Sequence, residues 1–319
     1  MGRRRKGRRV DGWLIVDKPS GITSNAVVTR LRRCTGAAKV GHAGTLDPLA
    51  TGVLPLAFGE ATKTIAHVMD STKVYRFTVR WGEARDTDDA EGAVTAASDV
   101  RPVTAAIAAA LPHLEGEIMQ VPPAYSAIKV DGKRAYALAR ADRPPKLAPR
   151  PGRVMRFTLI RERDPDHAEF EVVAGKGVYM RALARDLALA LGTVGHITVL
   201  RRLSVGRFRE GDAIPLEFFE SVGHSAPALE HLLPVETALD DIPALALTES
   251  EVVRIRHGQP VAVLRSEDFR TIESLDDGAV ICAMAAGKLV ALTRLSGRQI
   301  HPVRVINPPN GEHTDVDYR

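Results

Sequence analysis

The clearest periodic signal in the chain is a strict alternation of apolar and polar side chains over residues 75–81. Only an extended strand places every second residue on one face, so this segment is predicted to be a half-buried strand. Residues 179–191 show instead the three-to-four-residue spacing of an amphipathic helix. Strand and helix patterns follow one another without the regular period of a doubly wound fold. The sequence therefore predicts a mixed α+β fold.

Apolar runs and turn residues divide the rest of the chain into short elements. Strands are expected at 13–16, 53–57, 124–130, 153–163 and 168–174. Helices are expected at 23–34, 60–69, 103–111 and 134–140, and loops at 37–52, 83–92 and 142–152. The length of 319 residues favours two domains. We expect a large domain at 11–245, a small β-rich one at 246–307, and tails at 1–10 (basic and disordered) and 308–319. The acidic, proline-broken segment 210–251 marks the boundary.

Charge is sorted by region along the chain. The net charge is +5, yet residues 1–10 alone hold six Lys or Arg, so the remainder sums to −1. Residues 129–156 hold nine Lys or Arg against two Asp, whereas residues 210–251 hold ten acids and neither Lys nor Arg. One such run is typical of a solvated surface. Two runs of opposite sign favour a polyanion such as RNA on the basic side.

Several classes of protein are excluded by what the sequence lacks. Two cysteines give neither a disulfide framework nor a zinc cluster, so a reducing cytoplasm is expected. No apolar run is long enough to span a bilayer, and no phosphate-binding loop or zinc-deaminase motif is present. Ser126 and Lys129 match a Ser-x-x-Lys pattern, but its companion motif is absent. No metal, nucleotide or redox cofactor is expected.

The stretch at 41–52 holds three glycines and a proline around a single acid, Asp47. Irregular loops between elements often carry active sites. An Asp in a glycine-rich loop is nevertheless more often a turn residue than a nucleophile. Composition alone leaves both interpretations open.

A set of motifs in order along the chain resembles the TruB family of bacterial tRNA pseudouridine-55 synthases. They are residues 16–24, 41–52, 73–75, 86–92, 121–129, 176–181 and 200–202. The resemblance implies a catalytic domain with a mixed, largely antiparallel sheet flanked by helices. Residues 247–305 are more loosely similar to the PUA domain, an RNA-binding module that ends many members. The chain departs from the family at Ala43, Trp81, Val178 and Met180.

The family reaction detaches uracil from its ribose, turns the ring and rejoins it through C5. Carried over by motif, Asp47 is the attacking carboxylate, and the sequence leaves open whether it attacks the sugar or the base. Arg181 is expected to hold the charge of Asp47. Because a stacked uridine must be flipped out, Tyr75 is expected to stack on it. Without the resemblance, core packing would be the favoured interpretation of a tyrosine on this apolar strand face.

The remaining expected site residues bind the substrate or support the loop. Tyr179 lines the same pocket, His42 contacts RNA beside the flipped uridine, and Lys18 supports the catalytic loop. An insertion at 129–152 is expected to clamp the T stem-loop of tRNA, with contacts from Lys129, Lys146, Arg150 and Arg153. The chain is expected to act as a monomer without guide RNA, membrane or protein partner. Two alternatives remain: an RNA-folding chaperone without catalysis, and a guide-dependent relative within a ribonucleoprotein.

Overall fold

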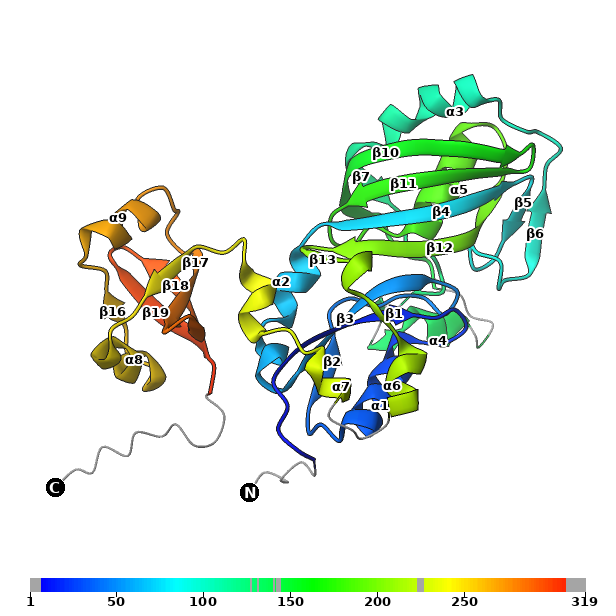
Figure 1. Ribbon diagram of the computed structural model, residues 1–319. Helices are drawn as coiled ribbons and strands as arrows, with labels where there is room; N and C mark the ends of the chain where they lie inside the picture. The colour runs from blue at the N-terminus through cyan, green and yellow to red at the C-terminus, as the bar shows by residue number, and fades with distance from the viewer. Residues whose placement is uncertain are drawn as a thin grey trace.

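The computed structural model describes residues 7–126, 128–130, 132–139, 141, 145–222 and 227–307. Two β-sheets organise these residues, a ten-stranded sheet in the body and a five-stranded sheet near the C-terminus (Figure 1). No helix among the described residues is long and apolar enough to cross a membrane.

The large sheet is mixed and largely antiparallel, which confirms the predicted α+β class. Its neighbours pair antiparallel except at two places, β14–β1 and β3–β12. The order is β14 (Ile214–Pro215), β1 (Gly12–Lys18), β3 (Thr51–Phe58), β12 (Gly195–Val205), β4 (Lys73–Trp81), β11 (His167–Ala174), β10 (Arg150–Asp164) and β7 (Gly116–Gln120). Two short strands join it off this path, β2 (Val40–His42) on β3 and β13 (Phe208–Arg209) on β12.

The core lies between this sheet and the helix α5 (Met180–Ala190), which crosses behind the strands in Figure 1. The alternating residues of β4 explain the packing: Phe77 and Val79 are buried in one cluster with Leu183 and Leu187 of α5. The rings of Phe77 and Phe170 lie 5.7 Å apart. The period-two pattern of β4 and the helical pattern of α5 therefore meet in one apolar layer.

Helix α1 (Ser24–Thr35) begins and ends where the sequence predicts. The Thr23 hydroxyl caps it by accepting from the Ala26 N–H at 3.1 Å, and Gly36 ends it with a φ of 63°. The other helices and 3₁₀ turns of the body are η1 (Gly59–Lys63), α2 (Ile65–Asp70), α3 (Thr104–Ala110), η2 (Leu111–Leu114), α4 (Ala135–Ala139), η3 (Glu210–Asp212), α6 (Leu216–Val222), α7 (Pro227–Glu230) and η4 (Val235–Leu239). Two small hairpins pair β5 (Glu83–Arg85) with β6 (Val94–Ala97) and β8 (Lys129–Val130) with β9 (Lys133–Arg134).

The C-terminal sheet has its own apolar core. Its order is β15 (Ala244–Ala246), β17 (Val280–Ala285), β18 (Lys288–Ser296), β19 (Gln299–Val305) and β16 (Val261–Ala262), with helices α8 (Glu249–Arg256) and α9 (Ser266–Ile272) beside it. Ile255, Ile281 and Ile300 are buried at its centre. The predicted boundary at 245/246 falls inside β15. Two hydrogen bonds tie the end of the sheet to the body: Lys63 Nζ donates to the Val305 carbonyl and the Asn307 N–H to Glu60.

Three expectations for individual segments are wrong. Residues 8–10 belong to the fold, because Arg8 exchanges backbone hydrogen bonds with Gly36 and Ala38. The expected loop at 37–52 contains β2, which pairs with β3 although its residues carry no apolar run. The expected strand at 124–130 is a strand only at Lys129–Val130. The acidic segment 210–251 spans the junction of the two parts: α6 and α7 within it contact α1, and β15 near its end belongs to the C-terminal sheet. Residues 1–6 and 308–319 lie outside the described residues.

Candidate active site

Asp47 lies in the loop between β2 and β3, and its side chain is 34% exposed. The turn at residues 18–24 is hydrogen-bonded to this loop. The Ser24 hydroxyl donates to the Leu46 carbonyl at 3.1 Å and accepts from the Leu46 N–H at 2.8 Å. The Gly21 N–H donates to the Pro48 carbonyl at 2.8 Å. Backbone contacts therefore fix the residues on both sides of Asp47 and leave its carboxylate accessible.

Arg181, on the first turn of α5, forms an ion pair with this carboxylate. Its Nε donates to Oδ2 of Asp47 at 2.9 Å, and its own side chain is only 4% exposed. The other two nitrogens donate to the carbonyls of Thr87 and Tyr125 at 2.8 and 2.9 Å. All three nitrogens of the guanidinium are thus engaged, which fixes its orientation toward Asp47.

The acidic turn after β5 folds over α5 and completes this network. Asp89, almost fully buried, lies 3.4 Å from the Arg181 guanidinium, so Arg181 serves two carboxylates. One helical turn further, Arg185 pairs with Asp88 at 2.8 Å. Asp88 has a φ of 59°, an uncommon backbone conformation outside glycine. The sequence motif at residues 86–92 was noted without a role. The signal for one is the spacing of Arg181 and Arg185, which are four residues apart and therefore lie on one face of the helix.

Comparison with known proteins shows the family of the chain. A family model described as "TruB family pseudouridylate synthase (N terminal domain)" matches residues 32–180, and one described as "tRNA pseudouridylate synthase B C-terminal domain" matches residues 181–240. The chain is 56% identical to a tRNA pseudouridine synthase B of Rhodospirillum rubrum, over 96% of this chain and 100% of that protein. A second, from Gluconacetobacter diazotrophicus, is 55% identical over 95% and 100%.

The chain belongs to the TruB family. It is a tRNA pseudouridine synthase, an isomerase.

Solved structures share the fold. A crystal structure of the archaeal box H/ACA Nop10–Cbf5 complex superposes with a TM-score of 0.70 at 23% identity, over 94% of this chain and 87% of that chain. An H/ACA ribonucleoprotein bound to a substrate RNA containing 2′-deoxyuridine gives a TM-score of 0.71 at 23% identity, over 97% and 92%. At this identity the likeness extends to the fold.

The two tyrosines expected in the TruB-family pocket are both half-buried. Tyr75 lies on the core side of β4, and its register partner in β12 is Arg202. Tyr179 precedes α5, where its N–H donates to the Gln120 side chain at 2.8 Å and its carbonyl accepts from it at 3.1 Å. Burial, with the nearby charge of Asp47, raises the pKa of Tyr179, so this side chain is a neutral phenol near pH 7.

His42 and Lys18 lie on either side of the loop. The Nδ1 of His42 is buried and has no hydrogen-bond partner among the described residues. Burial, then the Arg202 charge, lowers the pKa of His42 and favours the neutral imidazole. Lys18 is fully buried and donates to the carbonyls of Pro19 and Pro48. Burial lowers its pKa to about 8, against the opposing pull of Asp47. The Lys18 ammonium thus bonds to the loop residue that follows Asp47.

The residues expected to clamp RNA make fewer contacts than the loop that carries Asp47. Lys146, Arg150 and Arg153 are exposed, and Arg150 is near enough to Tyr179 to influence its pKa. Arg153 makes a long ion pair of 3.7 Å with Glu117. The side chain of Lys129 lies outside the described residues.

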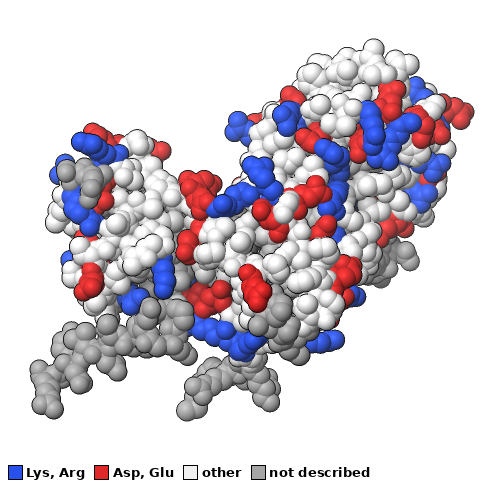
Figure 2. Space-filling model, viewed as in Figure 1, with Lys and Arg blue, Asp and Glu red and all other residues white. Residues whose placement is uncertain are grey.

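The end of the basic run lies elsewhere, on the open face of the sheet. Figure 2 shows Lys and Arg mixed with Asp and Glu over β4, β10 and β11. There Arg156 shares Glu171 with Arg76, at 3.5 and 2.8 Å. Arg156 is thus part of an ion-pair lattice on the sheet, and is not among the residues near Asp47.

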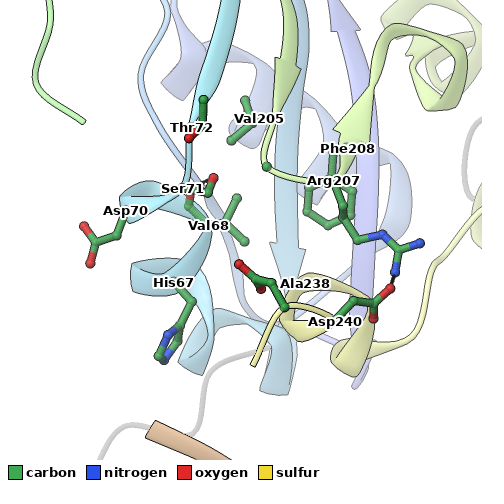
Figure 3. Close-up of a pocket in the computed structure, with 12 residues that line it drawn as sticks. His67, Val68, Asp70, Ser71, Thr72, Val205, Arg207, Phe208, Ala238 and Asp240 are labelled. Carbon is green, nitrogen blue, oxygen red and sulfur yellow. Dashed lines mark hydrogen bonds and ion pairs between the residues drawn. The ribbon is translucent and has the colours of Figure 1, made fainter. Parts of the chain in front are cut away.

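A cavity of about 500 Å³ opens away from this site, between α2, the β12–β13 turn and the end of η4 (Figure 3). Arg207 and Asp240 form an ion pair across one side of it. None of its lining residues is among the expected site residues. Among the described residues, no cluster of His, Cys, Asp or Glu is arranged to hold a metal ion.

Proposed function

We propose that this protein isomerises uridine 55 in the T loop of tRNA, without guide RNA, with Asp47 as the attacking carboxylate. The carrying observation is the asymmetry of the ion pair: Asp47 is one-third exposed, whereas its partner Arg181 is buried. The three hydrogen bonds of the Arg181 guanidinium fix its Nε toward Oδ2 of Asp47, and a carboxylate held in this way can attack carbon. The exposed oxygens leave room for a substrate.

The reaction conserves atoms and electrons. The bond between C1′ and N1 of uridine breaks, a bond between C1′ and C5 forms, C5 loses its proton and N1 gains one. Asp47 forms a transient covalent bond, to the sugar or to the base, and is released at the end. No oxidant, reductant or added group is needed.

The substrate reaches Asp47 as a base flipped out of the RNA stack. Tyr75 offers an aromatic face at the edge of the core, and stacking of a base on such a face contributes ~1–3 kcal/mol. Tyr179 and His42 line the same site as neutral groups. Neutral side chains suit an uncharged uracil ring, and the cations around Arg150 suit the phosphates that flank it.

The RNA partner is supported by the relatives and by the charge. Both relatives, 55% and 56% identical, are tRNA pseudouridine synthases B of bacteria. We assign the T stem-loop to the exposed cations Lys146, Arg150 and Arg153, and a further RNA contact to the PUA-like domain at 246–307. A bacterial cytoplasm, where tRNA is processed, is the compartment that this role implies.

The test uses purified protein and an unmodified tRNA transcript, with pseudouridine mapped along the chain by mass spectrometry. We expect product at position 55 without any added RNA, and none in a matched transcript with cytidine at 55. Product at another position, or only after a guide RNA is added, would contradict the proposal. Absence of product together with faster tRNA refolding would favour the chaperone alternative.

A further inference from the structure

Arg202 lies at the centre of the large sheet, where three strands that build the site meet. It belongs to β12 and is paired in register with Gly52 of β3 on one side and Tyr75 of β4 on the other. Its side chain is 1% exposed and is one of the largest fully buried side chains of the described residues. One buried residue thus touches both the strand that follows Asp47 and the strand that carries Tyr75.

The guanidinium of Arg202 binds the backbone near the start of the catalytic loop, residues 43–52, and one residue beyond its end. Its Nε donates to the Val53 carbonyl at 2.8 Å, and Nη2 donates to the Gly44 carbonyl at 3.1 Å. Asp47 lies between these two attachment points. A loop held at both ends by one rigid, planar group has little freedom to shift relative to that group.

Two glycines allow the loop to close around Arg202. A Cβ added at Gly52 would stand 2.2 Å from the Arg202 carbonyl oxygen, and one at Gly44 would stand 3.3 Å from Nη1. Both have positive φ values, 97° and 110°. These contacts explain why this part of the loop needs glycine, and they show how closely it follows Arg202.

No carboxylate of the described residues lies within 4 Å of Arg202, although it is buried. Burying a cation without such a partner is costly, and the acceptors of Arg202 among the described residues are the carbonyls of Val53 and Gly44. Burial lowers the pKa of Lys18 on β1, His42 on β2 and Lys73 on β4, and the charge of Arg202 lowers each of them further. An apolar residue would fill the space without this cost, so packing alone does not account for the arginine.

The adjacent Arg201 provides a contrast within the same strand. Arg201 is partly exposed and pairs with Asp17 and Glu210 at 2.8 and 2.5 Å. It makes no hydrogen bond to the backbone of residues 43–50 in the described contacts. The two arginines therefore differ in what they hold: Arg201 forms surface ion pairs, and Arg202 holds the catalytic loop.

We propose that Arg202 is a positioning residue, which holds the 43–52 loop so that Asp47 faces a base stacked on Tyr75. It acts through the backbone of the loop and does not touch the substrate. The inference rests on the proposed role of Asp47. It extends that role by naming what keeps the carboxylate in place while RNA binds and leaves.

The experiment measures single-turnover rate, tRNA affinity and hydrogen exchange in the full-length protein. Arg202→Met should slow the rate roughly 100-fold with little change in affinity, because a shift of ~1 Å at the reacting group costs about that much. Arg202→Lys keeps the charge but reaches one carbonyl, so it should slow the rate only about 10-fold, as expected for one lost hydrogen bond. Amides of residues 43–53 should exchange faster in both variants, with those of β4 unchanged.

Arg201→Met and Arg201→Lys are the matched controls, and both should keep the rate and the exchange of the wild type. A wild-type rate in Arg202→Lys and Arg202→Met would overturn the inference, and so would a slower rate without faster loop exchange. If Arg202→Met does not fold, Arg202→Lys decides by the same criteria. An inactive Asp47→Asn variant alongside fully active Arg202 variants would refute only this inference, whereas an active Asp47→Asn would refute the proposed function.

Discussion

The proposed site has two regions of opposite character, the buried network under Asp47 and the exposed cations of the 145–153 segment. Arg181, in the network, is 4% exposed and engaged at all three nitrogens. Arg153, in the segment, is 70% exposed with a single ion pair of 3.7 Å. The same residue type is thus fixed in one region and free to rearrange in the other.

This difference separates the two tasks of the enzyme. Breaking a buried ion pair costs about 3–5 kcal/mol, whereas an exposed pair contributes only ~0–1 kcal/mol. The network can therefore hold a reacting group in one geometry, which chemistry requires. The segment can follow the phosphates of an RNA with many weak contacts, which binding requires. Changes in the first region should affect rate, and changes in the second should affect affinity.

Within this comparison, the largest expected effect is on rate, from Arg181→Lys. Lysine keeps the charge but lacks the planar fork that contacts Asp47 and two carbonyls, so the carboxylate loses its fixed orientation. We expect the single-turnover rate to fall on the order of 100-fold with tRNA affinity unchanged. Arg185→Lys, one turn along the same helix and paired with Asp88, is the control and should be far milder. Equal losses of rate in Arg181→Lys and Arg185→Lys would contradict the special role of the Arg181–Asp47 pair.

Tyr75→Leu should have the next-largest effect on the rate. Leucine fills the half-buried position on β4 but offers no face for uracil, so the rate should fall about 10- to 100-fold, the equivalent of ~1–3 kcal/mol of stacking. Tyr75→Phe keeps the ring and should retain tRNA binding. The measurement is single-turnover rate beside thermal unfolding. A Leu variant as fast as the wild type would make Tyr75 a core residue only.

Neutralising Lys146, Arg150 and Arg153 together to Gln should weaken tRNA binding. Each lost phosphate contact should flatten the slope of log affinity against log salt by somewhat less than ~1. Binding is measured near physiological ionic strength, where the screening length is ~8 Å.

The control for this triple variant is Gln at three exposed acids of α6 and α7, Glu217, Glu220 and Glu230. That variant should leave the slope nearly unchanged. Equal slopes in both variants and the wild type would contradict the proposed clamp, but not the proposed role of Asp47.

The smallest expected effect is on stability at alkaline pH. Burial lowers the pKa of Lys18 to about 8 in the folded protein, from an ordinary value of 10.5. Between these values the unfolded chain holds a proton that the folded chain has lost, so this group makes the free energy of unfolding rise with pH. From pH 8 to 10 the free energy of unfolding of the wild type should therefore rise by roughly 2 kcal/mol relative to that of Lys18→Met. Urea unfolding at both pH values measures it, and a constant difference would contradict it.

The sequence predicted elements best where one physical signal dominated. Alternation at 75–81 and the amphipathic pattern at 179–191 gave β4 and α5. The strand β7 and the long strand β12 were not predicted. In β12, charged residues interrupt the apolar pattern, because Arg201 and Arg202 bind other strands and the loop. Strand β2 is three residues long and exists only because β3 pairs with it.

The site was predictable in its parts and less so in its connections. Motifs brought out Asp47 and Arg181, and the structure places them 2.9 Å apart. The contributions of Asp89 and Arg202 depend on contacts between segments far apart in the chain, which local patterns do not encode. Asp89 contacts Arg181, 92 residues away, and Arg202 contacts Val53 and Gly44, 149 and 158 residues away. Lys18 was expected at the site, but its burial beneath Pro48 follows only from the fold.

The most direct test of the account is the Asp47→Asn variant, assayed for both rate and tRNA affinity. Asparagine is nearly isosteric but is a poor nucleophile, and phosphate contacts elsewhere supply the binding. We predict no pseudouridine in single turnover with excess enzyme, and an affinity close to that of the wild type. Pseudouridine formation by a preparation shown by mass spectrometry to be free of deamidated Asp47 would contradict the central claim.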